Sequence, residues 1–402
     1  MREFGNARKM VPMRIGIAMI SAAALLLAGC GSDSEKADVD AEHAHNLSTV
    51  PLTNVVDAVR DAAASMSLVT HISRSGVNDW ESHPSTSVFV PQGSAPDGGF
   101  PIVVLGSHIT GLSADCAPSL SANLLGLAPT VAALLKAGYV VTVPDYQGLG
   151  QPPVNGNDSD TYHPYLDSTT GGYNMIDAAQ AAYEAVEQAS TSWLAMGAGE
   201  GGQAAWAANE LALDYNNFDG NLVGSVSISP VSDINDLADS AQNGTLSDAQ
   251  KVVLARFVAA LHTEDPEVVH LDDFRRGAAQ EQWDALLGCQ PVPTAQQVAA
   301  RIPPEDLKPR NADAVATLRG YLQKSTLPQG PPQAPMLVSY SGAEPVSPAT
   351  WTDRALDNAC TMGDTITIRK DEQPRLDSPE VLAWIEDRFN SVPAPNDCEG
   401  RA

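Results

Sequence analysis

The sequence predicts an α/β fold with a doubly wound, mostly parallel sheet and a helical segment inserted between two of its strands. Short apolar runs rich in β-branched residues alternate along the chain with longer segments that have apolar residues at helical spacing. Most of these runs are apolar at every position, which is typical of parallel strands covered by helices on both faces. Residues 231–330 break the alternation and favour helices alone.

The predicted core elements follow one another with recognisable stop signals. The triplet Asp97-Gly98-Gly99 predicts a turn between the first two strands, and Gly138 ends the helix that comes after them. The predicted strands are residues 87–90, 101–106, 139–144, 192–196, 222–228, 335–340 and 365–369. The predicted helices are residues 124–136, 173–188, 203–213 and 378–389. Residues 51–230 and 331–402 therefore form the two parts of one core.

The insertion, residues 231–330, contains three helical patterns, at residues 248–262, 279–287 and 294–301. An insertion between two parallel strands lies over the carboxyl edge of the sheet, where ligands bind in this architecture. We therefore interpret it as a cap over a binding site.

The first residues predict export. Arg2, Arg8, Lys9 and Arg14 precede an apolar run at residues 15–29, which is too short and wrongly flanked for a spanning helix. The run ends in LLAGC, which looks like a bacterial lipobox, so residues 1–29 read as a lipoprotein signal peptide and Cys30 as the site of lipid attachment. Residues 30–50 are polar and acidic and read as a disordered tether. We expect a protein anchored to the outer face of the bacterial cell membrane; an ordinary secretory signal with an incidental cysteine is the alternative.

Composition excludes several kinds of partner. The formal net charge of −26, without basic clusters, disfavours binding to nucleic acid. Four cysteines remain besides Cys30, and an even number in an exported chain predicts two disulfides in one of three connectivities. No CxxC pair or Cys/His cluster is present, so we expect no metal site and no cofactor.

A glycine-rich segment follows the predicted strand at residues 192–196. Serine hydrolases of the α/β-hydrolase fold place their nucleophile in a G-x-S-x-G turn between a strand and a helix. Residues 197–202 read GAGEGG in that context, so spacing and context fit while the central residue is Gly199. The alternatives are a simple tight turn or a phosphate loop, but neither GxxxxGK[ST] nor GxGxxG with an acidic partner is matched.

The rest of such a triad is tested by sequence order, because the acid and then the histidine follow the nucleophile in this fold. The eight histidines are at positions 43, 45, 71, 83, 108, 163, 262 and 270. None follows the last core strands, so we expect no imidazole beside the elbow. Under this prediction, Gly199→Ser alone restores no esterase activity.

Four further motifs carry a resemblance to a known family. They are DCAPS at residues 115–119, DYQGLG at 145–150, HPYL at 163–166 and AWIEDRF at 383–389. With the glycine turn, the chain resembles the secretory lipase family of α/β-hydrolases, of the lipase A type, over roughly residues 50–398. The resemblance implies an α/β-hydrolase fold and, in intact members, carboxylic ester hydrolysis.

The resemblance also assigns the degenerate site. The family turn is similar to GHSQGG, which puts Gly199 at the serine and Glu200 at the residue after it. The family acid falls at Glu344, and the family histidine falls near Arg375, where no histidine is present. The family's early HGTTG loop corresponds to SHITG, so His108 and Ile109 occupy the oxyanion loop.

Two cystine pairs are implied by the resemblance as well. Cys116–Cys289 would join core and cap, and Cys360–Cys398 would hold the C-terminal segment.

Three functions remain open. The first is a non-catalytic lipase-like protein that keeps a capped pocket for an apolar or acyl ligand, or for a partner. The second is an active lipase or carboxylesterase with a relocated nucleophile, for which Ser113 is the best stray candidate. The third is a structural envelope protein that interacts through its acidic surface.

Overall fold

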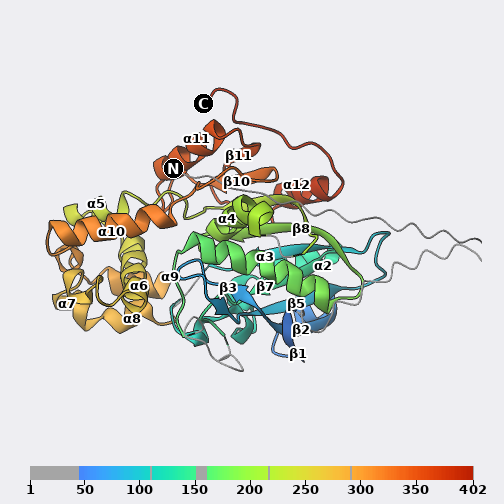
Figure 1. The fold of residues 1–402 in the computed structure, drawn as a ribbon, viewed down its shortest axis with the longest axis horizontal. Coiled ribbons are helices and arrows are strands. Elements are labelled where there is room, and N and C mark those ends of the chain that lie inside the picture. Colours follow the sequence, from blue (N-terminus) through green and yellow to red (C-terminus); the bar gives the residue numbers. More distant parts are fainter. Residues whose placement is uncertain (1–44, 109–110, 151–160, 216–217, 290–291, 402) are drawn as a thin grey trace, which may run out of the picture. The chain divides into compact units, whose positions relative to one another are not determined.

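The computed structural model describes residues 45–108, 111–150, 161–215, 218–289 and 292–401, and residues 44–402 form one compact unit. Its centre is a nine-stranded sheet in the order β1-β2-β5-β7-β6-β8-β9-β10-β11 (Figure 1). The strands from β7 to β11 pair in parallel, and β1, β2 and β5 add an antiparallel edge. The predicted mostly parallel α/β sheet is therefore confirmed.

The seven predicted strands are all present, most with slightly different ends. They are β5 (Ser85–Pro91), β6 (Phe100–Gly106), β7 (Val140–Pro144), β8 (Ala189–Ala198), β9 (Asn221–Ile228), β10 (Met336–Tyr340) and β11 (Ile366–Lys370). Strand β6 shows why the central runs are continuously apolar. Ile102 and Val104 belong to one core cluster, while Val103 and Leu105 belong to another. Successive side chains point to opposite faces, so both faces of the strand are buried.

Helices cover both faces of the sheet. Helices α3 (Ser168–Ala185) and α4 (Glu200–Tyr215) contribute to the first cluster, and α2 (Ala128–Lys136) and α12 (Pro379–Phe389) contribute to the second. A third cluster forms where α11 (Ala349–Thr361) packs near β10 and β11. A short helix, α1 (Asp57–Arg60), also lies on the side of α2. This layering is the doubly wound arrangement.

The N-terminal prediction needs a correction. Residues 46–50, assigned to the tether, belong to β1 (Asn46–Pro51), which pairs antiparallel with β2 (Ala63–His71). Strand β1 lies at an edge and needs only one partner, so few buried apolar residues mark it in the sequence. Strand β2 was also missed, as was the small hairpin of β3 (Ser73–Arg74) and β4 (Glu81–Ser82). The signal peptide, Cys30 and the rest of the tether lie outside the described residues.

The insertion forms six α-helices between β9 and β10, seen yellow to orange beside the sheet in Figure 1. They are α5 (Leu237–Asn243), α6 (Asp248–Glu264), α7 (Gly277–Glu281), α8 (Trp283–Leu287), α9 (Val292–Ala299) and α10 (Ala312–Ser325). The helix predicted over residues 279–287 is in fact two short helices, and α5 and α10 were not predicted. Within the described residues, no helix has the length and apolarity needed to cross a bilayer.

Candidate functional site

The site begins at a one-residue turn between β8 and α4. Gly199 connects these elements with a φ of +59°, in the left-handed region that favours glycine. Its N–H donates to the carbonyl of Ile228 at 3.0 Å, and its carbonyl accepts from Gln203 at 3.0 Å and Val231 at 3.2 Å. The predicted elbow is therefore sharper than the six-residue glycine segment suggested.

The flanking glycines are required by close packing. A Cβ on Gly197 would lie 2.2 Å from the Gly201 carbonyl oxygen, and a Cβ on Gly201 would lie 2.2 Å from the Gly106 carbonyl oxygen. At Gly199 the nearest atom to a Cβ would be the His108 Cβ, at 3.7 Å. The central position thus has room for a side chain, whereas its neighbours have none.

A mostly apolar cavity of about 110 Å³ lies at the elbow, between Gly199 and cap helix α6. Its lining comprises His108, Tyr165, Gly199, Glu200, Val231, Ala249, Val252, Val253, Arg256, Gln296 and Val346. The four residues from α6 recur at spacings of three and four, so one face of that helix forms a wall. The cap therefore covers the elbow, as an insertion at this point of the sheet should.

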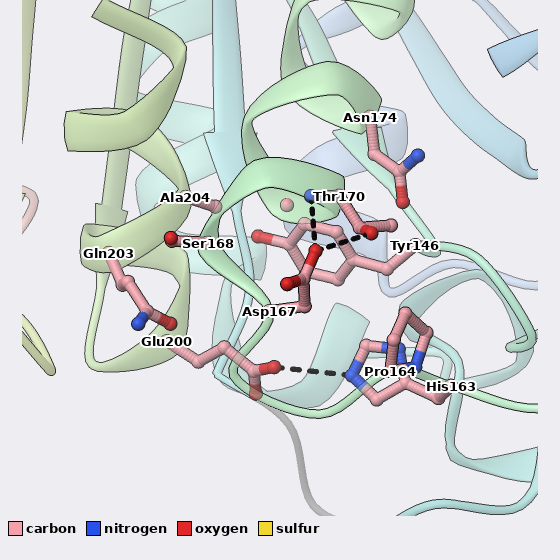
Figure 2. A pocket seen from close by; sticks show the side chains of 11 residues that line it. Tyr146, His163, Pro164, Asp167, Ser168, Thr170, Asn174, Glu200, Gln203 and Ala204 are labelled. Atoms are coloured by element: carbon pink, nitrogen blue, oxygen red, sulfur yellow. Dashed lines mark hydrogen bonds and ion pairs between the residues drawn. The ribbon is translucent and has the colours of Figure 1, made fainter. Parts of the chain in front are cut away.

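Glu200, in the first turn of α4, faces His163 (Figure 2). Its Oε1 lies 3.2 Å from the His163 Nε2 and accepts from the Leu166 N–H at 3.3 Å. The Nδ1 of His163 lies 3.0 Å from the Gln147 carbonyl, which can only accept, so Nδ1 carries a proton. The other ring nitrogen of His163 therefore faces the Glu200 carboxyl group.

The second oxygen of Glu200 has no hydrogen-bond partner among the described residues, although it is buried. A carboxylate oxygen is a hydrogen-bond acceptor. A buried acceptor without a donor is costly, so this atom is a candidate point of ligand contact.

His108 lies at the end of β6, beside Gly199. Burial lowers its pKa, the nearby Glu200 carboxylate raises it by less, and the Arg256 charge lowers it again. The imidazole is therefore neutral at neutral pH. The expectation that no imidazole lies beside the elbow is wrong, because His108 and His163 both reach it from segments that precede Gly199 in the sequence. Ile109, the other residue assigned to the oxyanion loop, lies outside the described residues.

The cap contributes one buried cation. Arg256 is only 2% exposed and donates through Nε to the Leu286 carbonyl at 3.0 Å. It also hydrogen-bonds to the side chain of Tyr165, whose pKa is raised by burial above all. The guanidinium is thus held by protein groups on the cap side of the cavity.

Glu344, at the position of the family's triad acid, lies close to the elbow but binds a serine hydroxyl and a backbone N–H group. The Oε1 of Glu344 accepts from the Ser229 hydroxyl at 2.6 Å and from the Ser341 N–H at 2.8 Å. Ser229 follows β9, next to the residue whose carbonyl binds the Gly199 N–H, and has a φ of +44°. The carboxylate that would orient a histidine therefore binds a hydroxyl and a backbone donor instead.

Arg375, at the position of the family's triad histidine, has no hydrogen bond or ion pair with Gly199 or Glu344 among the described residues. The guanidinium of Arg375 binds both carboxylate oxygens of Asp377, two residues away, and its side chain is 66% exposed. Gly199 and Glu344 are thus brought near each other through the end of β9, while Arg375 binds elsewhere.

Both implied disulfides are confirmed. Cys116–Cys289 joins the loop after β6 to the cap, and Ser113 has its hydroxyl 3.3 Å from the Cys116 sulfur and 3.6 Å from the Cys289 sulfur. The described contacts of Ser113 therefore include no imidazole. Asp115 lies near the same two sulfurs, but a disulfide leaves neither of them as a thiolate to bind a metal.

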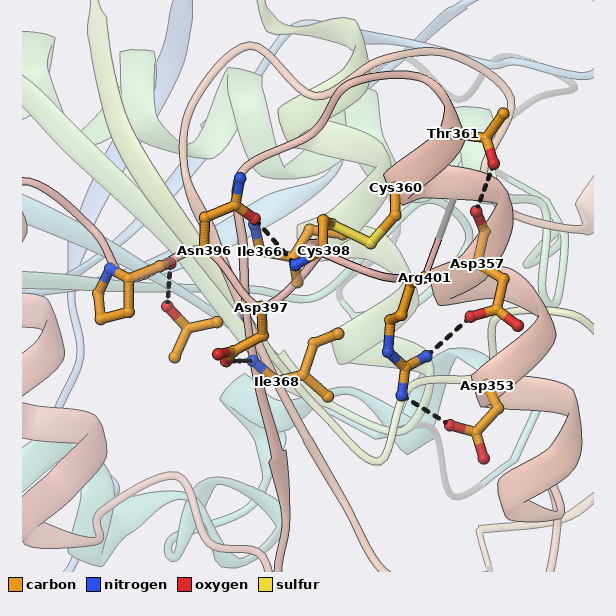
Figure 3. The surroundings of a disulfide bond; sticks show 12 residues. Asp353, Asp357, Cys360, Thr361, Ile366, Ile368, Asn396, Asp397, Cys398 and Arg401 are labelled. Atoms are coloured by element: carbon orange, nitrogen blue, oxygen red, sulfur yellow. Dashed lines mark hydrogen bonds and ion pairs between the residues drawn. A yellow bond between two sulfur atoms is a disulfide. The ribbon is translucent and has the colours of Figure 1, made fainter.

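The second disulfide, Cys360–Cys398, holds the C-terminal segment against β11 (Figure 3). The Asp397 N–H donates to the Ile366 carbonyl at 2.8 Å, and the Asp397 carboxylate accepts from the Ile368 N–H at 2.8 Å. This segment therefore binds backbone groups of the edge strand.

A strand-to-helix elbow at the edge of a doubly wound sheet, beneath a helical insertion, defines a capped α/β-hydrolase. A model of the family described as secretory lipase matches residues 127–397, and the chain belongs to this family. Its fold is similar to that of Candida antarctica lipase A in its closed state, with a TM-score of 0.68 and 15% identity, covering 88% of this chain and 84% of that one.

Two further relatives are similar. The rice cell wall degrading esterase LipA from Xanthomonas oryzae, in a ligand-bound form, has a TM-score of 0.65 and 18% identity, covering 87% of this chain and 96% of that one. Lipase A of Arthroderma benhamiae is 26% identical over 88 residues, which are 20% of this chain and only 19% of that protein. The structural likenesses establish the shared fold.

Proposed function

We propose that this protein is a non-catalytic member of the secretory lipase family that binds an apolar ligand in the cavity at its elbow. The observation that carries the proposal is Gly199: the position of the nucleophile has no side chain, yet it borders a mostly apolar cavity beneath α6. Two further features support binding rather than turnover. The buried Glu200 Oε2 has no hydrogen-bond partner among the described residues, and the Cys116–Cys289 disulfide links the cap to the core.

The catalytic half of the proposal is tested by hydrolysis. The full chain is assayed with p-nitrophenyl butyrate and p-nitrophenyl palmitate and is treated in parallel with a fluorophosphonate probe. We expect hydrolysis no faster than in buffer and no labelled serine, because the elbow offers no hydroxyl. Turnover together with a labelled serine would overturn the proposal.

The binding half is tested by native mass spectrometry of the exported protein. We expect an additional mass from a co-purified apolar molecule. A matched variant, Val252→Glu, places a charge on the α6 wall of the cavity and should abolish that mass while leaving the helical circular dichroism unchanged. A bound molecule that persists in the variant would locate binding elsewhere.

A second candidate function is hydrolysis by a relocated nucleophile, and one observation favours Ser229 over Ser113 for it. Ser229 has a positive φ, and its hydroxyl donates to a carboxylate. Such backbone strain is a common feature of functional sites. If any esterase activity is detected, Ser229→Ala should abolish it and Ser113→Ala should not.

We also propose export and anchoring through a lipid on Cys30, on the strength of the LAGC segment and the acidic residues that follow it. Intact-mass measurement of the exported protein should show loss of residues 1–29 and the added mass of acyl chains. Cys30→Ser should release the protein from the membrane fraction.

A further inference from the structure

A second cavity, of about 300 Å³, lies between the cap and the core. The stripe of α6 that lines the elbow cavity continues along this second cavity, at Phe257, Ala260, Leu261 and Glu264. Its other walls come from α10, from the loop before α3 and from the turn between β3 and β4. Only Tyr165 lines both cavities, so they follow one another along α6 as separate spaces.

Two carboxyl groups line the second cavity, one from the core and one from the cap. Asp167, before α3, accepts through Oδ1 from the Thr170 N–H at 2.7 Å and the Thr170 hydroxyl at 2.6 Å (Figure 2), while its Oδ2 has no hydrogen bond among the described residues. The Glu264 carboxyl group on α6 has no hydrogen bond or ion pair there either. Neither belongs with the fully enclosed side-chain atoms, so both are open to a ligand.

The charge of the lining is not balanced. Lys324 on α10 is the one cation in it; its Nζ lies 5.0 Å from the centre of the Tyr321 ring, and it forms no ion pair with either carboxyl group. Burial is the main cause that raises the pKa of Asp167 and the pKa of Glu264, the latter to about 7, and Lys324 offsets this only in part. With both carboxyl groups ionised, two negative charges face one positive charge, so the cavity complements a cation.

The walls favour an organic cation over a metal ion. The rings of Tyr165, Phe257 and Tyr321 line the cavity, and aromatic faces attract ammonium groups. Within the described ranges, no three metal-ligating side chains come together at this place. A volume of about 300 Å³ is at the lower end for small-molecule sites and suits a compact ligand.

We propose that the second cavity binds a small organic ammonium ion, such as a trimethylammonium compound, between Asp167 of the core and Glu264 of the cap. This site is separate from the elbow cavity and does not depend on the proposed function. Because the bound cation contacts both cap and core, its binding should also raise the melting temperature.

Choline and its carbon analogue 3,3-dimethyl-1-butanol test the charge preference, since the two have nearly the same shape and only choline is charged. Their dissociation constants are measured by ligand-observed NMR with the full chain carrying Cys30→Ser. Sodium chloride at about 0.15 M limits attraction by the acidic surface to about 8 Å. We expect choline to bind about tenfold or more tightly than the analogue, as for a charge pair at a partly buried site.

Three variants locate the site. Asp167→Asn and Glu264→Gln should each weaken choline binding about tenfold without affecting the analogue. Asparagine is also a good N-cap, so the first of them preserves the start of α3. Lys324→Met should strengthen choline binding about threefold or more, because it removes a competing charge. The control is Glu267→Gln, an exposed carboxylate outside the lining, which should change nothing.

The charge of choline is independent of pH, so a pH profile reports on the protein alone. Choline affinity should rise from pH 6 to pH 8 as Glu264 loses its proton near pH 7, and Glu264→Gln should reduce that rise. The other ionisable groups that interact with Glu264 or Asp167 are Tyr162, His163, Tyr173, Asp265, Tyr321 and Lys324.

Each contrary result overturns the proposal in a different way. Absent choline binding, or equal binding of choline and the analogue, removes the cation preference. Unchanged affinity in both Asp167→Asn and Glu264→Gln assigns the binding to the acidic surface. Displacement of choline by equimolar calcium chloride at constant ionic strength indicates a metal site. Tighter binding of glycine betaine than of choline, or weaker choline binding in Lys324→Met, indicates a site for zwitterions.

Discussion

At the residue scale, Gly199 leaves the central position of the elbow without a side chain, and as a glycine it adopts the left-handed backbone without strain. A non-glycine residue at a left-handed φ costs about 1–3 kcal/mol of strain. Gly199 adopts this φ without that cost. The close contacts of the flanking glycines are also retained. The turn therefore has the close-packed backbone of a strand-to-helix elbow and no side chain at its centre.

The position of His108 reverses an expectation drawn from sequence order. Gly199→Ser places a hydroxyl next to a neutral imidazole whose Cβ lies 3.7 Å from the new Cβ. We expect the new serine to react with a fluorophosphonate, since a general base is worth about 10²–10⁴-fold in rate and the Glu200 N–H has the oxyanion-donor position. The measurement is the rate of covalent labelling at residue 199.

The double variant Gly199→Ser/His108→Ala is the control for that experiment, and it should label at least about 100-fold more slowly. Equal labelling in both variants would show that His108 takes no part. Turnover should remain slow even in the single variant, because Glu344 binds Ser229 and leaves His108 without an orienting carboxylate.

Glu210 on α4 predicts a pH dependence of stability. Burial raises its pKa to about 8, against the hydrogen bonds from the Gln329 and Gly330 N–H groups. The folded state therefore binds this proton more tightly than the unfolded chain does. The associated stability is complete below the unfolded pKa, near 4.5, and is lost as the pH rises towards 8.

The test compares Glu210→Gln with the parent protein by urea denaturation between pH 5 and pH 8. The amide keeps the acceptor for both N–H groups and never ionises. Across that range the variant should gain stability relative to the parent by up to about 1.4 kcal/mol per pH unit. Parallel profiles for the two proteins would show that Glu210 is not the titrating group.

The residues of the site differ in how far the sequence could place them. Gly199, Glu200 and Glu344 follow strands whose ends lie at one edge of the sheet, so their proximity was predictable from topology. His163 was not, because its side chain reaches Glu200 from the loop before α3, and loop paths leave no periodic signal.

At the scale of elements, the strands that are buried on both faces are the ones that the sequence predicts. The central strands are continuously apolar and were predicted within a few residues. Strand β1 has only one partner strand and no buried residue, and the alternation of buried and exposed residues in β2 is too weak to stand out. In the cap, α6 was predictable from its capping box at Ser247, whereas α10 buries only a few large apolar side chains, Val315, Leu318 and Leu322.

The two disulfides should contribute unequally to stability. Cys116–Cys289 closes 173 residues and Cys360–Cys398 closes 38, so the chain-entropy model assigns them about 5 and about 4 kcal/mol. We expect the paired change to alanine at Cys116 and Cys289 to lower both the melting temperature and the retention of a co-purified apolar ligand, because it releases the cap from the loop after β6.

The pair at Cys360 and Cys398 provides the comparison. Its paired change to alanine should lower the melting temperature without affecting the retention of a co-purified apolar ligand, because it frees only the segment that binds β11. Calorimetric melting and native mass spectrometry of both double variants measure this. Loss of ligand binding in the second double variant would contradict the separate roles.

At the scale of the whole molecule, acidic residues outnumber basic ones by 49 to 23. Some acids are paired: Arg354 on α11 binds Asp233 and Asp236, which precede the first cap helix, and Arg319 on α10 binds Asp239. The Arg319–Asp239 pair is exposed and is worth only about 0–1 kcal/mol, whereas Asp233 is buried, so its pair with Arg354 is screened less by salt. Most carboxylates have no cation available, so repulsion among them outweighs the pairs.

This balance predicts the sign of the salt effect. Raising sodium chloride from about 10 mM to about 0.5 M shortens the screening length from about 30 Å to a few ångströms and so removes most of the repulsion. We expect the melting temperature to rise, by roughly 1–2 °C for each kcal/mol recovered in a chain of this length. A fall in melting temperature would mean that the ion pairs dominate. Arg319→Gln separates the two, because loss of its exposed pair with Asp239 should lower stability at low salt and lose most of that effect at high salt, while the salt-induced rise itself persists.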